Sequence, residues 1–170
     1  MRIEPMGAAD LAGAAALVAG HELFARYGLT PSGLAARLYA ALVNGDGLLV
    51  ARLAGVAAPA GFVWFLERGT FYHSGYVRLL VVGRGYTGLG IGSRLMDAAE
   101  AHIFRAAPDV FLLVNTENHG AQRFYEARGY RRVGRLDGYA APGLDEYVYR
   151  KRRPVGFSAP DVVPEHRPAR

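Results

Sequence analysis

Five glycines stand in ten positions in the stretch GRGYTGLGIG at residues 83–92, between an apolar run that ends at Val82 and a helical pattern. Glycine loses more backbone entropy on folding than other residues, so this run is costly unless the main chain must approach something closely. Apolar residues at helical spacing from Ile91 to Ile103 predict a helix over 90–105. A loop between a strand and a helix start directs amide N–H groups and the positive end of the helix dipole toward one point. The stretch therefore predicts an anion site, with tight strand–helix packing as the alternative explanation.

The apolar patterns around this loop predict a chain that alternates helices and strands. Strands are expected at 1–5, 48–55, 62–68, 71–82, 109–115, 130–136 and 144–151, and helices at 9–26, 30–44, 90–105 and 118–128. The strands between 48 and 82 follow one another through turns, one of them at 68–70, which indicates antiparallel pairing. The helix at 90–105 forms a crossover, which indicates that the two strands flanking it are parallel.

The chain length and the last segment set the expected domain organisation. A chain of 170 residues fits one domain, which we predict over 1–151. Residues 152–170 carry prolines and polar residues without periodicity, so they are expected to form a disordered basic tail. No signal peptide or membrane segment is visible in the first residues, where Glu4 and Asp10 interrupt a weakly apolar stretch. The expected location is the cytoplasm, without a membrane partner.

Composition and charge narrow the possible partners. The chain has no cysteine, which excludes disulfides, thiol catalysis and cysteine-bound metals. Its histidines lack ligand spacing, so no metal is expected. The net charge of +5 suits an anionic ligand. Basic residues outside the run RKRR at 150–153 are scattered, and no RNA-binding aromatic motif is present, so no nucleic-acid partner is expected.

Two familiar phosphate-binding loops fit the glycine stretch poorly. A Walker loop requires a Lys-Ser or Lys-Thr pair directly after its second glycine, but Gly88 is followed by Leu89. The dinucleotide fingerprint G-x-G-x-x-G matches Gly83, Gly85 and Gly88. Its fold, however, needs several further strand–helix units on the C-terminal side, and only one is predicted here.

A third loop fits on both sides. The segment LLVVGRGYTGLGIGSRLM resembles motif A of the GNAT acetyltransferases, in which a strand and a turn lead through Gln/Arg-x-x-Gly-x-Gly/Ala into a helix, with residues 87–92 in those six places. The segment NHGAQRFYEARGY at 118–130 resembles motif B of the same family. Together the likeness covers residues 76–150. It implies the α/β (α+β) GNAT fold, with a mixed, mostly antiparallel sheet of six or seven strands, helices on both faces, and splayed central strands that form an acyl-CoA cleft.

The resemblance also implies acetyl-CoA as the acyl donor, without a metal. Its pyrophosphate is expected on the amides of Thr87, Gly88, Leu89, Gly90, Ile91, Gly92 and Ser93, and its pantetheine arm along Leu80, Val81 and Val82. Asn118 matches the residue that hydrogen-bonds this arm, and an asparagine there would also cap a helix. Tyr125 matches the general acid that protonates the departing thiolate. Thr87 replaces the usual Gln or Arg, so one long polar side chain is lost from the loop.

The general base and the acceptor are less well defined. Leu113 and Tyr76 stand where members of the family carry carboxylates, which leaves Glu67, His73 and Tyr76 as candidates for holding a chain of water molecules. The expected function is direct transfer of an acetyl group to a primary amine, either a small molecule or a peptide or protein N-terminus. The segment at 135–151, which contains Tyr139, loosely resembles the hairpin that walls the peptide groove of N-terminal acetyltransferases. A degenerate, non-catalytic acyl-CoA sensor is the alternative, and both a monomer and a homodimer remain open.

Overall fold

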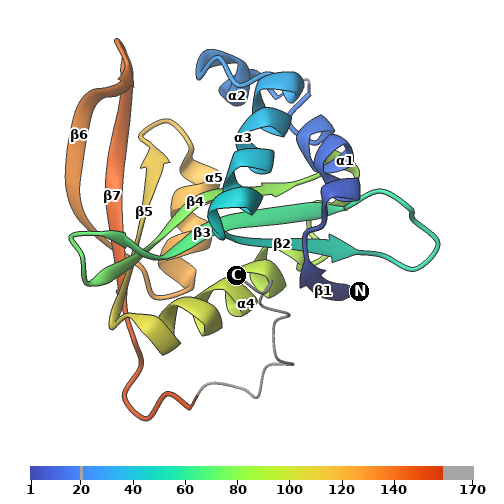
Figure 1. Cartoon of the computed structure of the whole chain (residues 1–170). Coiled ribbons are helices and arrows are strands. Elements are labelled where there is room, and N and C mark those ends of the chain that lie inside the picture. Colours follow the sequence, from blue (N-terminus) through green and yellow to red (C-terminus); the bar gives the residue numbers. More distant parts are fainter. Residues whose placement is uncertain (20, 159–170) are drawn as a thin grey trace.

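The computed structural model describes residues 1–19 and 21–158, and within them seven strands form one sheet in the order β1-β2-β3-β4-β5-β7-β6 (Figure 1). The strands are β1 (Arg2–Pro5), β2 (Gly47–Arg52), β3 (Gly61–Thr70), β4 (Ser74–Val82), β5 (Asp109–Asn115), β6 (Arg131–Ala141) and β7 (Leu144–Arg152). The helices are α1 (Leu11–Ala16), α2 (Glu22–Arg26), α3 (Pro31–Asn44), α4 (Ile91–Ala106) and α5 (His119–Ala127). Strands β4 and β5 are parallel, and the other neighbouring strands are antiparallel. The predicted mixed, mostly antiparallel sheet is confirmed.

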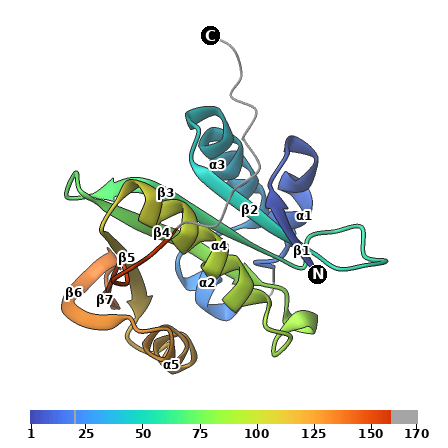
Figure 2. The ribbon, with the colours of Figure 1, turned by 90° about the horizontal axis from the view of Figure 1, so that it is seen from below.

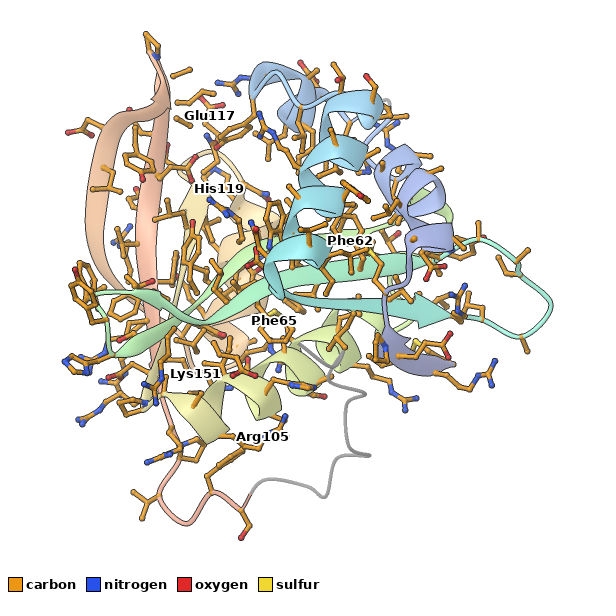
Figure 3. The ribbon with its side chains drawn as sticks, viewed as in Figure 1. Phe62, Phe65, Arg105, Glu117, His119 and Lys151 are labelled. Carbon is orange, nitrogen blue, oxygen red and sulfur yellow. The ribbon has the colours of Figure 1, made fainter. Side chains whose placement is uncertain are left out.

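Helices cover both faces of the sheet, as predicted. Helices α1 and α3 lie on one face, whereas α4 crosses the other face in front of β3 and β4 (Figure 2). The strands alternate between the two cores: Phe62 packs on the side of α3 and Phe65 on the side of α4 (Figure 3). Both rings are almost fully buried. This period-2 alternation is what a sheet covered on both sides requires.

The two central strands separate halfway along their length. They pair only from Ser74 opposite Asp109 to Val77 opposite Leu112. Beyond that point residues 79–82 of β4 pair with β3, and residues 113–115 of β5 pair with β7, so these two facing edges are not bonded to each other. We call this region the β4–β5 divergence. It is the splay of central strands that the family resemblance implies.

A β-bulge lies at the start of the divergence. Leu79 pairs with Trp64 and Val77 pairs with Phe65, which leaves Arg78 as an extra residue in β4. A bulge shifts the alternation of side chains by one position. Accordingly Val77 packs in the core under α4, whereas Val81, also at an odd position, packs in the core under α3.

Two predicted local features are wrong. The helix expected over 9–26 is broken, because the N–H groups of Leu17 and Val18 bond three residues back, which tightens and ends α1, and His21 is extended. The turn expected at 68–70 lies instead after Thr70, which pairs with Ser74. Phe71 and Tyr72 make this turn with φ values of 51° and 62°, a conformation that aromatic residues rarely adopt. Gly69 serves packing, since a Cβ there would lie 2.8 Å from Leu66 Cβ.

Ordered contacts continue past residue 151, where we expect the domain to end. Arg152 is the last residue of β7, and Arg153 donates through its N–H to the Pro108 carbonyl at 2.8 Å. The ring of Phe157 then packs edge to face on that of Phe104, with centroids 5.6 Å apart. Residues 153–157 therefore continue the domain under α4. The remainder of the predicted tail, 159–170, lies outside the described residues.

Candidate active site

The first turn of α4 has main-chain donors without an intrahelical partner. Its first intrahelical bond runs from the Arg94 N–H to the Gly90 carbonyl at 3.1 Å, so the amides of Ile91, Gly92 and Ser93 come before it. Gly90 is the N-cap residue of α4, and among the residues that the structure describes no side chain caps this helix start. The three amides and the helix dipole are therefore available to an anion.

The loop before α4 needs glycine for its conformation. Gly88 and Gly90 have φ values of 79° and 74°, and a Cβ at either would meet nothing within 4 Å. Space is therefore open outside the main chain at both positions. Leu89 between them is 58% exposed. The Thr87 hydroxyl turns back and donates to the Arg84 carbonyl at 3.2 Å, so it closes the loop in this structure.

The predicted strand residues lie at the β4–β5 divergence. Val81 is buried in the core under α3, and Leu80 and Val82 are partly buried against the core under α4. Their main-chain edge toward β5 is the unpaired one. The backbone there can pair with amide groups of an extended ligand, as a further strand would. Residues 80–93 thus run without interruption from the unpaired strand edge at the divergence to the start of α4.

The two motif B residues have different surroundings. Asn118 caps α5, since its Oδ1 accepts from the Ala121 N–H at 3.0 Å, so its helix-cap role is seen. Tyr125 is 7% exposed, with its ring edge to face against those of Phe124 and Tyr130. Within the described ranges no group hydrogen-bonds the Tyr125 hydroxyl. Burial raises the pKa of Tyr125 far above its ordinary value, so at neutral pH the hydroxyl is protonated and can donate.

A buried polar cluster that the sequence analysis missed lies at the end of β5. Asn115 and Glu146 stand opposite each other on β5 and β7, and each is only 4% exposed. Tyr27, which follows α2, donates its hydroxyl proton to Glu146 and accepts from Asn115 Nδ2 at 3.0 Å. We call these three residues the Tyr27–Asn115–Glu146 cluster. A sequence signal existed, because Glu146 interrupts the otherwise apolar alternation of Leu144 and Val148.

Burial changes the acid–base properties of this cluster. It raises the pKa of the Glu146 carboxyl above its ordinary value, and the hydrogen bond from Tyr27 opposes this rise. Burial, assisted by the bond to Glu146, raises the pKa of Tyr27 to about 12. The half-buried Tyr76 is also affected: burial raises its pKa, and Tyr139 and Glu146 add to the effect. Side chains from the residue after α2, from β5 and from β7 therefore meet at Glu146.

Helix α2 is attached to this end of the sheet. Arg26 forms an ion pair with Glu117, which lies just after β5 and close to α2 (Figure 3). Together with Tyr27, this contact holds α2 over the carboxyl end of β5. The other base candidates, Glu67 and His73, are exposed on the β3–β4 hairpin, and Leu113 offers no titratable group. In residues 1–19 and 21–158 no three His, Cys, Asp or Glu side chains are grouped as a metal site would need.

Comparison with known proteins gives one consistent result. The family model described as acetyltransferase (GNAT) family matches residues 19–130. N-alpha-acetyltransferase 30 of Schizosaccharomyces pombe is 33% identical over 85 residues, which are 49% of this chain and 56% of that protein. The match thus spans only about half of the relative's length.

Solved structures share the fold. A GNAT-family protein from Desulfovibrio desulfuricans has a TM-score of 0.75 at 14% identity, covering 89% of this chain and 98% of the other. The protein yncA of Salmonella typhimurium, solved with its cofactor acetyl-CoA, has a TM-score of 0.70 at 18% identity, covering 96% and 99%. At these identities the likeness concerns the fold alone.

Proposed function

The chain belongs to the GNAT acetyltransferase family, and on this premise we propose that it transfers an acetyl group from acetyl-CoA directly to a primary amine. The observations that support this most are the edge of β4 that β5 leaves unpaired beyond Val77 and the first-turn amides of α4, which precede its first intrahelical bond. Three free amides at a helix start suit a pyrophosphate, and an unpaired strand edge suits the amides of a pantetheine arm. Leu80, Val81, Val82 and residues 87–93 would hold the donor.

The proposed reaction needs an amine nucleophile, an oxyanion donor and an acid. A neutral amine attacks the thioester carbonyl, and a main-chain N–H near Val82 would stabilise the oxyanion. Tyr125 would then protonate the departing thiolate, which its raised pKa permits at neutral pH. Direct transfer is favoured because the chain has no cysteine to form an acyl-enzyme.

For the acceptor we favour the α-amino group of a peptide or protein. The likeness to an N-alpha-acetyltransferase supports this class over a small-molecule amine. The alternative of a non-catalytic acyl-CoA sensor drew on the lack of carboxylates at positions 76 and 113. The buried Glu146 beside the divergence weakens that argument. A cytoplasmic location remains a prediction. In the described ranges no helix has the length and apolarity to cross a bilayer.

The test measures acetyl-CoA binding and turnover together. Saturating acetyl-CoA is expected to raise the melting temperature of the protein, because it binds only the folded chain. Short peptides with a free N-terminus are expected to release CoA thiol, which a chromogenic disulfide detects. Gly90→Glu places bulk and negative charge at the open face of the loop and is expected to abolish the thermal shift. Gly85→Glu is the matched control, since a Cβ there also meets nothing within 4 Å but φ is not positive. Equal shifts for wild type and Gly90→Glu would refute the donor site.

A further inference from the structure

We propose that Glu146 on β7 is the general base of the reaction, and that Tyr27 and Asn115 position its carboxylate at the acceptor side of the β4–β5 divergence. This rests on the acetyl transfer proposed above. The positions where the family resemblance expects a carboxylate hold Leu113 and Tyr76, so the base must come from elsewhere in the fold.

The sheet register places Glu146 next to Leu113, where the family resemblance expects a carboxylate. Leu113 stands opposite Val148, and Asn115 stands opposite Glu146, so Leu113 and Glu146 are diagonal neighbours on one face. Diagonal positions on neighbouring strands are about 7–8 Å apart, within reach of a long side chain. That face is the one under α2 and α3, because Leu112 and Val114 of β5 point the other way into the core under α4. A carboxylate on β7 can thus reach the position at which β5 carries Leu113 instead of an acidic residue.

The surroundings of Glu146 differ from those of a structural carboxylate. Glu100, which is equally buried, is neutralised by Lys151 at 2.6 Å and by Arg128 at 3.1 Å. Glu146 forms no ion pair with any of the described residues, and its partner is the neutral Tyr27 phenol. An unpaired buried carboxylate costs folding free energy, and such groups are concentrated at functional sites.

One oxygen of Glu146 remains available. Tyr27 donates to Oε1, and no group in the described ranges donates to Oε2. In those ranges, His21 Nε2 is the one side-chain nitrogen or oxygen atom that is both fully covered and without a hydrogen-bond partner. Because Glu146 Oε2 has no partner either, it is not fully covered and keeps some contact with solvent. A substrate ammonium or an intervening water can therefore approach it.

The proton balance of the step is as follows. The acceptor ammonium gives one proton to Glu146, and the neutral nitrogen attacks the thioester carbonyl carbon, so a C–N bond forms. The C–S bond then breaks, and the thiolate takes the Tyr125 proton, which solvent replaces. The nitrogen that attacked still carries two protons and loses one of them to solvent, which leaves the amide. Glu146 then releases to solvent the proton that it accepted. Burial raises the pKa of Glu146 above its ordinary value, which makes its carboxylate a stronger base than an exposed one.

The groups facing Glu146 define what a pH profile reports. Tyr27 after α2 and Asn115 on β5 are its neighbours on the same face, whereas Asp145 on its own strand and Tyr76 on β4 are coupled to it through charge alone. The hydrogen bond from Tyr27 lowers the pKa of Glu146, whereas the charge of Asp145 raises it. Removing the Tyr27 hydroxyl is therefore expected to move the acidic limb of kcat/KM to higher pH.

The decisive variant is Glu146→Gln, which can still accept the Tyr27 hydrogen bond but cannot take a proton. We expect kcat/KM at pH 7 to fall by about 10²–10⁴, with the acidic limb replaced by a rise that follows deprotonation of the free amine. Acetyl-CoA binding is expected to stay unchanged. Glu117→Gln is the matched control, because it removes an exposed carboxylate that also holds α2.

Each outcome assigns the failure to one proposal. Full kcat/KM and an intact acidic limb in folded Glu146→Gln would refute the base while leaving acetyl transfer standing. If Glu146→Gln does not fold, Tyr27→Phe decides, because a limb that stays at the wild-type pH would refute the assignment. A wild-type protein without turnover on any amine would refute acetyl transfer itself, and the base with it.

Discussion

Replacing Tyr125 by phenylalanine separates a catalytic hydroxyl from a packing one. The ring is 7% exposed, and its edge-to-face contacts with Phe124 and Tyr130, at centroid distances of 5.1 and 5.4 Å, need no hydroxyl. In the described part of the chain nothing hydrogen-bonds that hydroxyl. The variant thus loses no protein hydrogen bond, and we expect its stability to change by less than the about 1 kcal/mol that such a bond is worth.

The effect on turnover should be far larger. A positioned general acid is worth about 10²–10⁴ in rate, so kcat is expected to fall by that factor, equal to about 3–5 kcal/mol of activation free energy. The assay measures thiol release per folded molecule, with thermal melting on the same preparation. Since burial raises the pKa of Tyr125 far above its ordinary value, the wild-type protein should keep this donor throughout the alkaline range tested.

The neighbouring Tyr130 supplies the matched control. Its hydroxyl donates to the buried Glu100 at 3.2 Å, so Tyr130→Phe removes a real hydrogen bond away from the proposed chemistry. We expect it to cost about 1 kcal/mol of stability and to leave turnover per folded molecule unchanged. If Tyr125→Phe behaves in the same way, with stability lost and turnover kept, Tyr125 is a core residue and the acid assignment is wrong.

Four further predictions concern the fold and its pH dependence. Gly75→Ala would place a Cβ 2.2 Å from Ile103 Cγ2 and is expected to destabilise the protein by about 1–3 kcal/mol in urea unfolding, whereas Gly85→Ala should be neutral. Glu100→Gln leaves Arg128 and Lys151 without their buried partner, and we expect a loss of about 3–5 kcal/mol by the same measurement. Phe157→Ala removes the contact with Phe104, and a melting temperature equal to wild type would contradict the packing of residues 153–157. The pKa of Glu146 is higher in the folded protein than in the unfolded chain. Its contribution to stability is therefore present below the unfolded pKa and is lost as the pH rises through the folded pKa. The unfolding free energy of wild type relative to Glu146→Gln should decrease over that range.

Features that depend on adjacent residues were predicted from the sequence, whereas contacts between residues far apart in the chain were not. The glycines before Ile91 and the crossover helix identified α4 and the parallel pair correctly, because both depend on adjacent residues. The turn at Phe71 and Tyr72 could not be predicted, since it uses a conformation that aromatic residues seldom adopt. Tyr27 and Glu146 are 119 positions apart, and they meet only because β7 lies between β5 and β6. No local pattern encodes that strand order, so the cluster was missed.

The divergence of β4 and β5 also affects how the protein exchanges amide hydrogen with deuterated water. In most sheets the central strands are the slowest to exchange, because both of their edges are bonded. Here every second N–H in the C-terminal half of β4 faces an edge that β5 does not complete, so these particular amides should exchange as fast as those of a surface loop. A bound molecule that pairs with this edge would reverse the order and make these amides among the slowest. A deuterium map recorded with and without ligand would then locate the bound arm residue by residue.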